Sequence, residues 1–228
     1  MAGYRFCRSD DVPLLVAAHD ACWVSRFGPE SAITVDDFKR ATRELGLWSS
    51  SCMVAFEGDE PIGVLLAAKR DGEANFVWRV AVKPGFERRG HGRHLLTSLA
   101  DKAAILGPSR LIAEIPAAWG DVRTFFARSG FVDEASYFDL VLDDAAAGIA
   151  PDPTLEDLLT PVSLDELLEH GLLDPSVRRA WRRSPASLRA RAEALGGLAI
   201  ATDRIEAFVL FCDEPGGREI VALGGEPR

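Results

Sequence analysis

The segment from Lys83 to Arg93 is the feature that most constrains the fold of this chain. It reads Lys-Pro-Gly-Phe-Glu-Arg-Arg-Gly-His-Gly-Arg and lies between an apolar, strand-like run and an amphipathic helical pattern. Glycines allow backbone N–H groups to approach an anion closely, and the start of a helix presents unpaired N–H groups at its positive end. The flanking arginines add positive charge. The segment therefore predicts a phosphate-binding loop between a strand and a helix, suited to a cofactor that carries a diphosphate.

A solvated run of charges is the alternative interpretation of this segment. The paired glycines, which follow Val82 and precede Leu95, favour the anion site. No Gly-Lys-Ser/Thr follows and G-x-G-x-x-G is absent, which excludes a P-loop and the dinucleotide fingerprint. Glu87 is an exception, because a carboxylate repels a diphosphate. Either Glu87 points outward and pairs with Arg88 or Arg89, or the loop holds its anion less tightly.

The charge balance limits the classes of partner. The chain has 35 acidic and 26 basic residues among 228, a net charge of −9, which argues against a general nucleic-acid binder. No run approaches the roughly 18 apolar residues needed to span a bilayer, and the first residues lack the apolar core of a signal peptide. We therefore expect a cytoplasmic protein that binds neither nucleic acid nor membrane.

The cysteines and histidines show no metal-binding pattern. The four cysteines are scattered without C-x-x-C or Cys/His ligand spacing, and the four histidines offer no ligand constellation. A zinc site or a disulfide framework is therefore not expected. We predict no metal, and we expect the cysteines to be buried as small apolar residues. They are Cys7, Cys22, Cys52 and Cys212.

The predicted elements through residue 143 follow the order β-α-α-β-β-β-α-β-α-β. Period-2 alternation and turn signals predict strands at residues 4–7, 52–56, 62–68, 76–82, 110–115 and 137–142. Apolar stripes at helical spacing predict helices at residues 12–23, 34–45, 95–106 and 121–129. The three successive strands after the second helix predict an antiparallel meander. The fold class we expect is α/β, of the α+β kind, with a mixed and mostly antiparallel sheet flanked by helices.

A second, smaller αβ unit is predicted after this first one. Residues 145–153, rich in Ala and Pro, predict a linker between a first domain at residues 1–144 and a second at residues 154–228. The second is expected to hold helices around residues 164–169 and 185–195 and strands at residues 198–201, 205–211 and 219–223. Its sequence of strands and turns is similar to that of residues 54–80, which we interpret as a weak internal repeat. A separate unit that matches by chance is the alternative.

The order of elements resembles the GNAT acetyltransferase superfamily over roughly residues 3–143. The motifs that carry the resemblance are Val80-Ala81-Val82-Lys83-Pro84 and Arg88-Arg89-Gly90-His91-Gly92. The family signature places Gln or Arg, two residues, Gly, one residue, then Gly or Ala; Gly90 and Gly92 match it, and Glu87 occupies the Gln/Arg position. The resemblance implies acetyl-CoA as co-substrate, with its pantetheine arm between splayed parallel strands at residues 76–82 and 110–115. The residues implied to bind it are Val80, Ala81, Val82, Arg88, Arg89, Gly90, His91, Gly92, Arg93 and Phe126.

The catalytic residues implied by the resemblance are fewer. Residues 125–131 are similar to the family's Phe-Tyr, three residues, Gly-Phe segment, but Phe126 stands where many relatives place a tyrosine that protonates the departing CoA thiolate. Tyr137, which begins the following predicted strand, is the substitute acid that we predict. Glu114 is the candidate base, with Glu73 as a second candidate, each acting through water. Surface carboxylates without a catalytic role are the alternative interpretation of both.

The resemblance implies an N-acetyltransferase that transfers an acetyl group from acetyl-CoA to a primary amine of a small molecule or protein terminus. Asp20, Asp36 and Asp37 would suit a cationic amine if they face it; solvated helix-surface charges are the alternative. A catalytically impaired acyl-CoA-binding or sensor protein of the same fold is the rival function, favoured by Phe126 and Glu87. A structural interaction module with an empty cleft is a third. The second unit lacks a glycine-arginine loop, so we expect it to cover an edge of the first, to wall the acceptor site or to make a homodimer contact.

Overall fold

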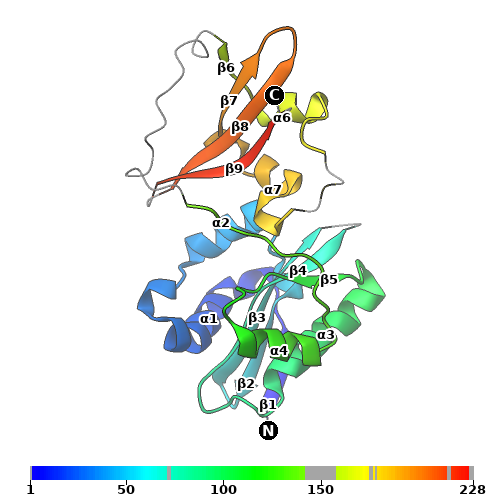
Figure 1. Ribbon diagram of the computed structural model, residues 1–228. Coiled ribbons are helices and arrows are strands. Elements are labelled where there is room, and N and C mark those ends of the chain that lie inside the picture. Colours follow the sequence, from blue (N-terminus) through cyan, green and yellow to red (C-terminus); the bar gives the residue numbers. More distant parts are fainter. Residues whose placement is uncertain are drawn as a thin grey trace. The chain divides into compact units, whose positions relative to one another are not determined.

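The computed structural model of the chain describes residues 2–70, 73–141, 158–174, 177, 179–214 and 217–225 (Figure 1). The chain divides into two compact units, Met1–Glu134 and Ala135–Arg228. Each unit has a sheet of its own, and we describe each by itself. The predicted linker at residues 145–153 lies outside the described residues, so the predicted domain limits at residues 144 and 154 stay a prediction.

The first unit is built on a five-stranded sheet in the order β1-β2-β3-β4-β5. The strands are β1 (Ala2–Phe6), β2 (Met53–Glu57), β3 (Glu60–Arg70), β4 (Ala74–Val82) and β5 (Leu111–Ala113). The first four pair antiparallel in succession, and β5 pairs parallel to β4. This mixed, mostly antiparallel sheet confirms the predicted fold class.

Helices cover both faces of this sheet. They are α1 (Val12–Phe27), α2 (Val35–Leu45), α3 (His91–Leu106) and α4 (Gly120–Arg128). Leu95 and Leu99 of α3 and Phe126 of α4 join the buried cluster that contains Leu65 and Val77 of the sheet. Neighbouring strand residues, whose side chains point to the opposite face of the sheet, are also buried. This second face is covered by α1, which contacts β2, β3 and β4. Thr34 and Asp37 cap the start of α2 with a reciprocal capping box.

The predicted strand at residues 137–142 is wrong in its described part. Residues 131–141 have no regular secondary structure, and Phe138, Leu140 and Val141 are exposed. The strand to which they would pair is short, since β5 ends at Ala113, and a short edge offers few backbone groups for a ladder. Leu142 lies outside the described residues.

In its described residues, the second unit is a four-stranded antiparallel sheet with two short α-helices. Its elements are β6 (Leu159–Pro161), α6 (Leu164–Glu169), α7 (Pro185–Arg189), β7 (Gly196–Ala201), β8 (Ile205–Glu214) and β9 (Gly217–Gly225), and the strand order is β6-β7-β8-β9. Its core includes Leu167, Leu188 and Leu210. One register shift interrupts each of the pairs β2–β3, β3–β4, β7–β8 and β8–β9. The shared element order and bulge positions are consistent with a partial repeat of the first unit.

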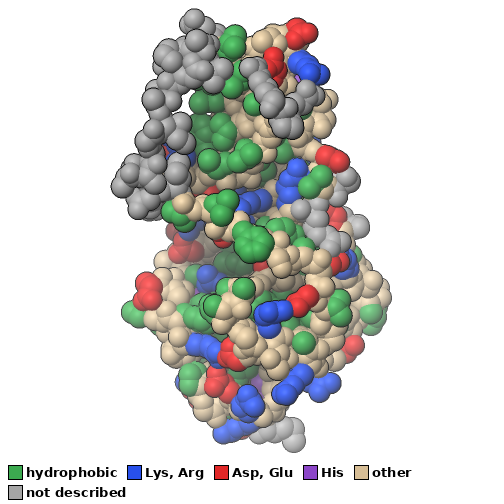
Figure 2. All heavy atoms as spheres, in the orientation of Figure 1, with side chains coloured by type: hydrophobic (Ala, Val, Ile, Leu, Met, Phe, Trp, Pro, Cys, Tyr) green, Lys and Arg blue, Asp and Glu red, His purple; other side chains and the backbone are tan. Residues whose placement is uncertain are grey.

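The molecular surface carries charges of both signs. On the face shown in Figure 2, basic and acidic side chains are interspersed, with no large patch of a single sign. Within the described residues, no helix combines the length and the apolar character that crossing a bilayer requires.

Candidate active site

The edge where β4 and β5 diverge positions the candidate site. The two strands pair only at Asn75 with Leu111, Phe76 with Ile112 and Val77 with Ala113. Beyond these pairs β4 continues to Val82 while β5 stops. The predicted splay between the strands is therefore confirmed. It leaves the last residues of β4 without a strand partner on that side in the described chain.

A cavity of about 420 Å³ opens at this splay. Its walls come from α1, the end of β4, the loop before α3, the residues after β5, and α4. Ten of the residues singled out in the sequence line it: Val80, Ala81, Val82, Arg88, Gly90, His91, Gly92, Arg93, Glu114 and Phe126. The structure thus brings together the end of β4, the segment of residues 83–93 that we call the glycine loop, and the candidate base Glu114.

Three candidates for cofactor binding or catalysis do not line this cavity. Arg89 places its guanidinium carbon 5.3 Å from the centre of the Phe86 ring. Glu73 lies on the turn before β4, with its carboxylate 3.9 Å from Arg70. Tyr137 is about half exposed and belongs to the second unit. The roles suggested for these three stay predictions.

The loop before α3 has the backbone of an anion-binding turn. Gly85 and Gly90 have φ of 88° and 89°, and Arg88 has a φ of 63°, which is uncommon for a residue with a side chain. Gly90 is the N-cap of α3, and it provides neither a side-chain cap nor an acidic neighbour in the first turn. The first N–H groups of α3 have no intrahelical acceptor. They are therefore available to an anion in the cavity.

The first residues of α3 pack closely against the rest of the unit. Nδ1 of His91 lies 2.5 Å from the Tyr4 hydroxyl oxygen of β1, and His91 is buried. At Gly92, a β-carbon would lie 3.2 Å from the Phe125 ring of α4 and 3.6 Å from Val82. The absence of a side chain there lets α3 approach β4 and α4 closely.

Glu87 has a partner that the sequence did not suggest. Its carboxylate lies 3.5 Å from Nη1 of Arg26 on α1, rather than pairing with Arg88 or Arg89. Nη2 of Arg26 also lies 2.6 Å from Asp121 of α4, and this hydrogen bond lowers the pKa of Asp121. The Arg26 guanidinium, on the cavity wall, thus pairs with two carboxylates.

Aromatic side chains of α1 form one wall of the cavity. His19, Trp23 and Phe27 follow each other at i, i+4 spacing, with ring centres 5.7 Å and 4.4 Å apart. Phe27 stacks in turn on Trp119, at 4.9 Å and 22° between ring planes. Trp23, Phe27 and Trp119 line the cavity, as does Trp78 of β4. The four-residue spacing is a signal that would have predicted this wall.

Arg79 of β4 is a cavity residue that sequence reasoning missed. Its guanidinium carbon lies 4.3 Å from the Trp78 ring and 5.1 Å from the Trp23 ring. Its Nη1 lies 2.5 Å from Nε2 of His19, which is fully buried. Burial lowers the pKa of both Arg79 and His19. No local sequence pattern predicts that Arg79 lines the cavity.

The acidic side chains proposed for a cationic acceptor are engaged elsewhere. Asp37 caps α2, and Asp36 lies 3.4 Å from Lys39. Asp20 contacts Nδ1 of His19 at 2.8 Å and accepts the backbone N–H of Ile33. None of the three aspartates lines the cavity.

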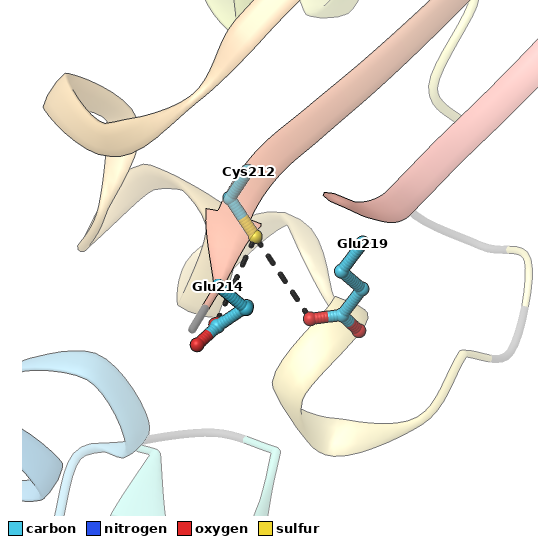
Figure 3. Close-up of side chains that lie close together, drawn as sticks. All are labelled: Cys212, Glu214 and Glu219. Carbon is cyan, nitrogen blue, oxygen red and sulfur yellow. Dashed lines mark hydrogen bonds between the residues drawn. The ribbon is translucent and has the colours of Figure 1, made fainter. Parts of the chain in front are cut away.

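A cluster in the second unit resembles a metal site in composition. Cys212, Glu214 and Glu219 place potential ligand atoms within 4.8 Å of one another (Figure 3). Arg182 lies 3.0 Å from Glu214 and Arg183 lies 3.2 Å from Glu219, so arginines already balance both carboxylates. Burial raises the pKa of the Cys212 thiol, which disfavours the thiolate that a metal requires. All four cysteines of the chain are free and buried, as predicted.

Comparison with known proteins places this geometry in a family. The family model described as the acetyltransferase (GNAT) family matches residues 14–131, just over half of the chain. No curated protein matches the sequence.

Solved structures with a similar fold include three acetyltransferases. The first is an aminoglycoside acetyltransferase from an uncultured soil metagenomic sample, in complex with sisomicin (14% identity, 62% of this chain and 97% of that chain covered, TM-score 0.50). The second is the ribosomal-protein-S18-alanine N-acetyltransferase of Escherichia coli (16%, 59% and 80%, TM-score 0.48). The third is the diaminobutyrate acetyltransferase of Paenibacillus lautus, in complex with its substrate and coenzyme A (20%, 56% and 74%, TM-score 0.44). At these identities the likeness concerns the fold alone.

The residues that the family model matches run from α1 through α4 and include the splayed edge, the glycine loop and the residues that line the cavity. The chain therefore belongs to the acetyltransferase (GNAT) family.

Proposed function

We propose that this protein transfers an acetyl group from acetyl-CoA to a primary amine of a small molecule or peptide terminus. The observation that carries the proposal is the cavity at the β4–β5 splay, because it joins an unpaired strand edge to an anion-binding helix start. The amide-containing pantetheine arm can pair with a strand edge, and the diphosphate can bind helix N–H groups. Free, buried cysteines fit a reducing compartment, and we propose a cytoplasmic location.

Different residues of the cavity would bind different parts of acetyl-CoA. The backbone of Val80 and Val82 would pair with the pantetheine arm, while Gly90, Arg88 and Arg93 would hold the diphosphate. Holding the thioester and the amine in line supplies on the order of 7–11 kcal/mol of the barrier reduction. Positioning of two substrates is therefore the largest contribution that we assign to the protein.

Glu114 is the proposed general base. It follows β5, is exposed, and lines the cavity, so it can take a proton through water from the acceptor's ammonium group, which leaves the neutral amine to attack. The amine nitrogen forms a bond to the acetyl carbon, the C–S bond breaks, and the leaving thiolate takes up a proton. Tyr137 remains the proposed acid. We expect Tyr137→Phe to lower kcat about tenfold or more, without a matching change in KM.

A second candidate function is an acyl-CoA-binding sensor. Phe126 favours it, because a buried phenyl ring on the cavity wall has no proton to give a leaving thiolate. The two functions share the binding site and differ only in turnover.

One experiment separates these functions. Acetyl-CoA is titrated into the full chain by calorimetry, and CoA-thiol release is followed in the same sample against a panel of primary amines. Binding with amine-dependent release supports the transferase, and binding without release supports the sensor. Absence of binding would overturn both.

Glycine variants provide the matched control for that titration. Gly90 and Gly58 both have positive φ, 89° and 59°, and a β-carbon at either position meets nothing within 4 Å. Replacement by alanine therefore strains both backbones, but only Gly90 lines the cavity. We expect Gly90→Ala to weaken acetyl-CoA binding about tenfold and Gly58→Ala to leave it unchanged.

A further inference from the structure

We propose that the amine acceptor also carries a carboxylate, and that Arg79 binds this group in the aromatic part of the cavity. The inference rests on the proposed function and identifies its substrate class: an amine with a carboxylate and an apolar, preferably aromatic, body. Three features carry it, namely the unbalanced charge of Arg79, the residues that hold this side chain, and the wall beside it.

The positive charge of Arg79 has no acidic partner in the described part of the chain. Its contacts are with Nε2 of His19 and with the rings of Trp23 and Trp78, all of them neutral groups. The negative charge of Asp20 acts on Arg79 only from a distance. The Asp20 carboxylate itself contacts His19. A half-buried cation with only neutral partners is costly to hold, and an anionic ligand would offset that cost.

Arg79 is held in position by a chain of hydrogen bonds. Asp20 contacts Nδ1 of His19 at 2.8 Å, and Nε2 of His19 faces Nη1 of Arg79 at 2.5 Å. The arrangement requires a neutral imidazole that donates from Nδ1 and accepts at Nε2. This uses one of the five N–H donors of the guanidinium. The others are left to bind a planar carboxylate, for which the guanidinium is well shaped.

The anion at Arg79 differs from the diphosphate of acetyl-CoA. Arg79 lies three residues before Val82, the last residue of β4 before the glycine loop, and three strand residues span about 10 Å. The loop has its own helix start and its own arginines, Arg88 and Arg93. The remaining arginine of the cavity, Arg26, is already paired with Glu87 and Asp121. Arg79 is thus the cavity arginine that remains for the acceptor.

The wall beside Arg79 defines the rest of the acceptor. Trp23, Phe27 and Trp119 form a continuous stack, with successive ring centres 4.4 Å and 4.9 Å apart. Aromatic surfaces of this kind bury apolar groups and stack on rings. A carboxylate on Arg79 would therefore anchor a molecule whose body lies along this stack, with its amine toward the thioester.

Direct binding of amine-free probes tests the subsite independently of turnover. We would titrate 3-phenylpropionate and its neutral isostere 3-phenylpropanamide into the full chain by calorimetry. We expect the carboxylate to bind about tenfold more tightly than the amide in the wild type. Arg79→Gln should reduce this ratio to about one, and Arg79→Lys should retain part of it. Arg110→Gln, at an exposed arginine outside the cavity, should leave the ratio unchanged, and circular dichroism should show that all variants are folded.

Several outcomes would overturn the inference: equal binding of both probes, no binding of the carboxylate, or the wild-type ratio in Arg79→Gln. Turnover then separates it from the proposed function, by comparing phenylalanine with phenylalaninamide as acceptors. If amines are acetylated without preference for the carboxylate, the subsite is wrong and the transferase stands. If the carboxylate binds through Arg79 but no amine on the panel is acetylated, the transferase is wrong and the subsite stands.

Discussion

The guanidinium of Arg26, on α1, lies 3.5 Å from the carboxylate of Glu87, in the glycine loop. This pair accounts for an acidic residue in a loop that we assign to diphosphate binding. The negative charge of Glu87 is met from a helix distant in sequence, so it does not fully oppose an anion. The pair is nonetheless about half exposed, and such pairs contribute only roughly 0–1 kcal/mol.

We predict that Glu87→Gln strengthens acetyl-CoA binding by about twofold to fivefold. The substitution removes a charge that repels the diphosphate, and it leaves Arg26 with Asp121 as its remaining acidic partner. Calorimetry at low salt measures the effect, which should shrink at high salt because exposed charges are screened. Glu30→Gln, at an exposed glutamate outside the cavity, is the control. Weaker binding by Glu87→Gln would mean instead that the ion pair positions the loop.

Gly92→Ala should weaken acetyl-CoA binding several-fold. The new β-carbon would lie 3.2 Å from the Phe125 ring, so α3 or α4 must shift at the cavity. Gly120→Ala is the matched control, since a β-carbon on this other helical glycine meets nothing within 4 Å. It should raise stability by up to about 1 kcal/mol through helix propensity alone. Calorimetry and thermal unfolding of both variants measure the two effects, and unaltered affinity in Gly92→Ala would contradict the prediction.

In a chain that carries Tyr137→Phe, Phe126→Tyr should raise kcat for amine acetylation by about tenfold to a hundredfold. It adds a hydroxyl to a ring that lines the cavity, and a positioned acid typically contributes roughly 10²–10⁴-fold. Phe125→Tyr adds the same hydroxyl to the neighbouring residue, which also lines the cavity, and should not raise kcat. Thiol release at saturating acetyl-CoA is the measurement. An unchanged rate would indicate that the thiolate already receives its proton from elsewhere.

The buried His19 should make stability depend on pH. Burial lowers its pKa below the usual value of about 6.5, so the unfolded chain takes up this proton at a higher pH than the folded chain. The stability that neutral His19 contributes is therefore complete above pH 6.5 and is lost as pH falls toward the lowered pKa.

His19→Gln tests this dependence, because an amide still offers an acceptor to Arg79 but does not titrate. The free energy of unfolding, measured in urea at a series of pH values, should fall less steeply below pH 6.5 in the variant than in the wild type. Equal slopes would show that His19 is not the group responsible.

The sequence by itself determined the order of elements in the first unit, the antiparallel meander and the loop before α3. These features depend on local physics: alternating apolar residues predict β4, and Gly85 and Gly90 permit positive φ values where the turn needs them. It also located ten of the residues that line the cavity, since the strand, loop and helix start to which eight of them belong are consecutive in the chain.

Only the tertiary structure decided which side chains lie against this strand, loop and helix start. The contacts of Arg26 with Glu87 and of Arg79 with His19 exist because α1 packs across β4, and no local pattern encodes a contact between residues so far apart. The predicted strand at residues 137–142 failed in its described part for a related reason. Its apolar residues suit a strand, but a strand forms only where a neighbouring edge offers hydrogen-bond partners, and β5 ends after three residues.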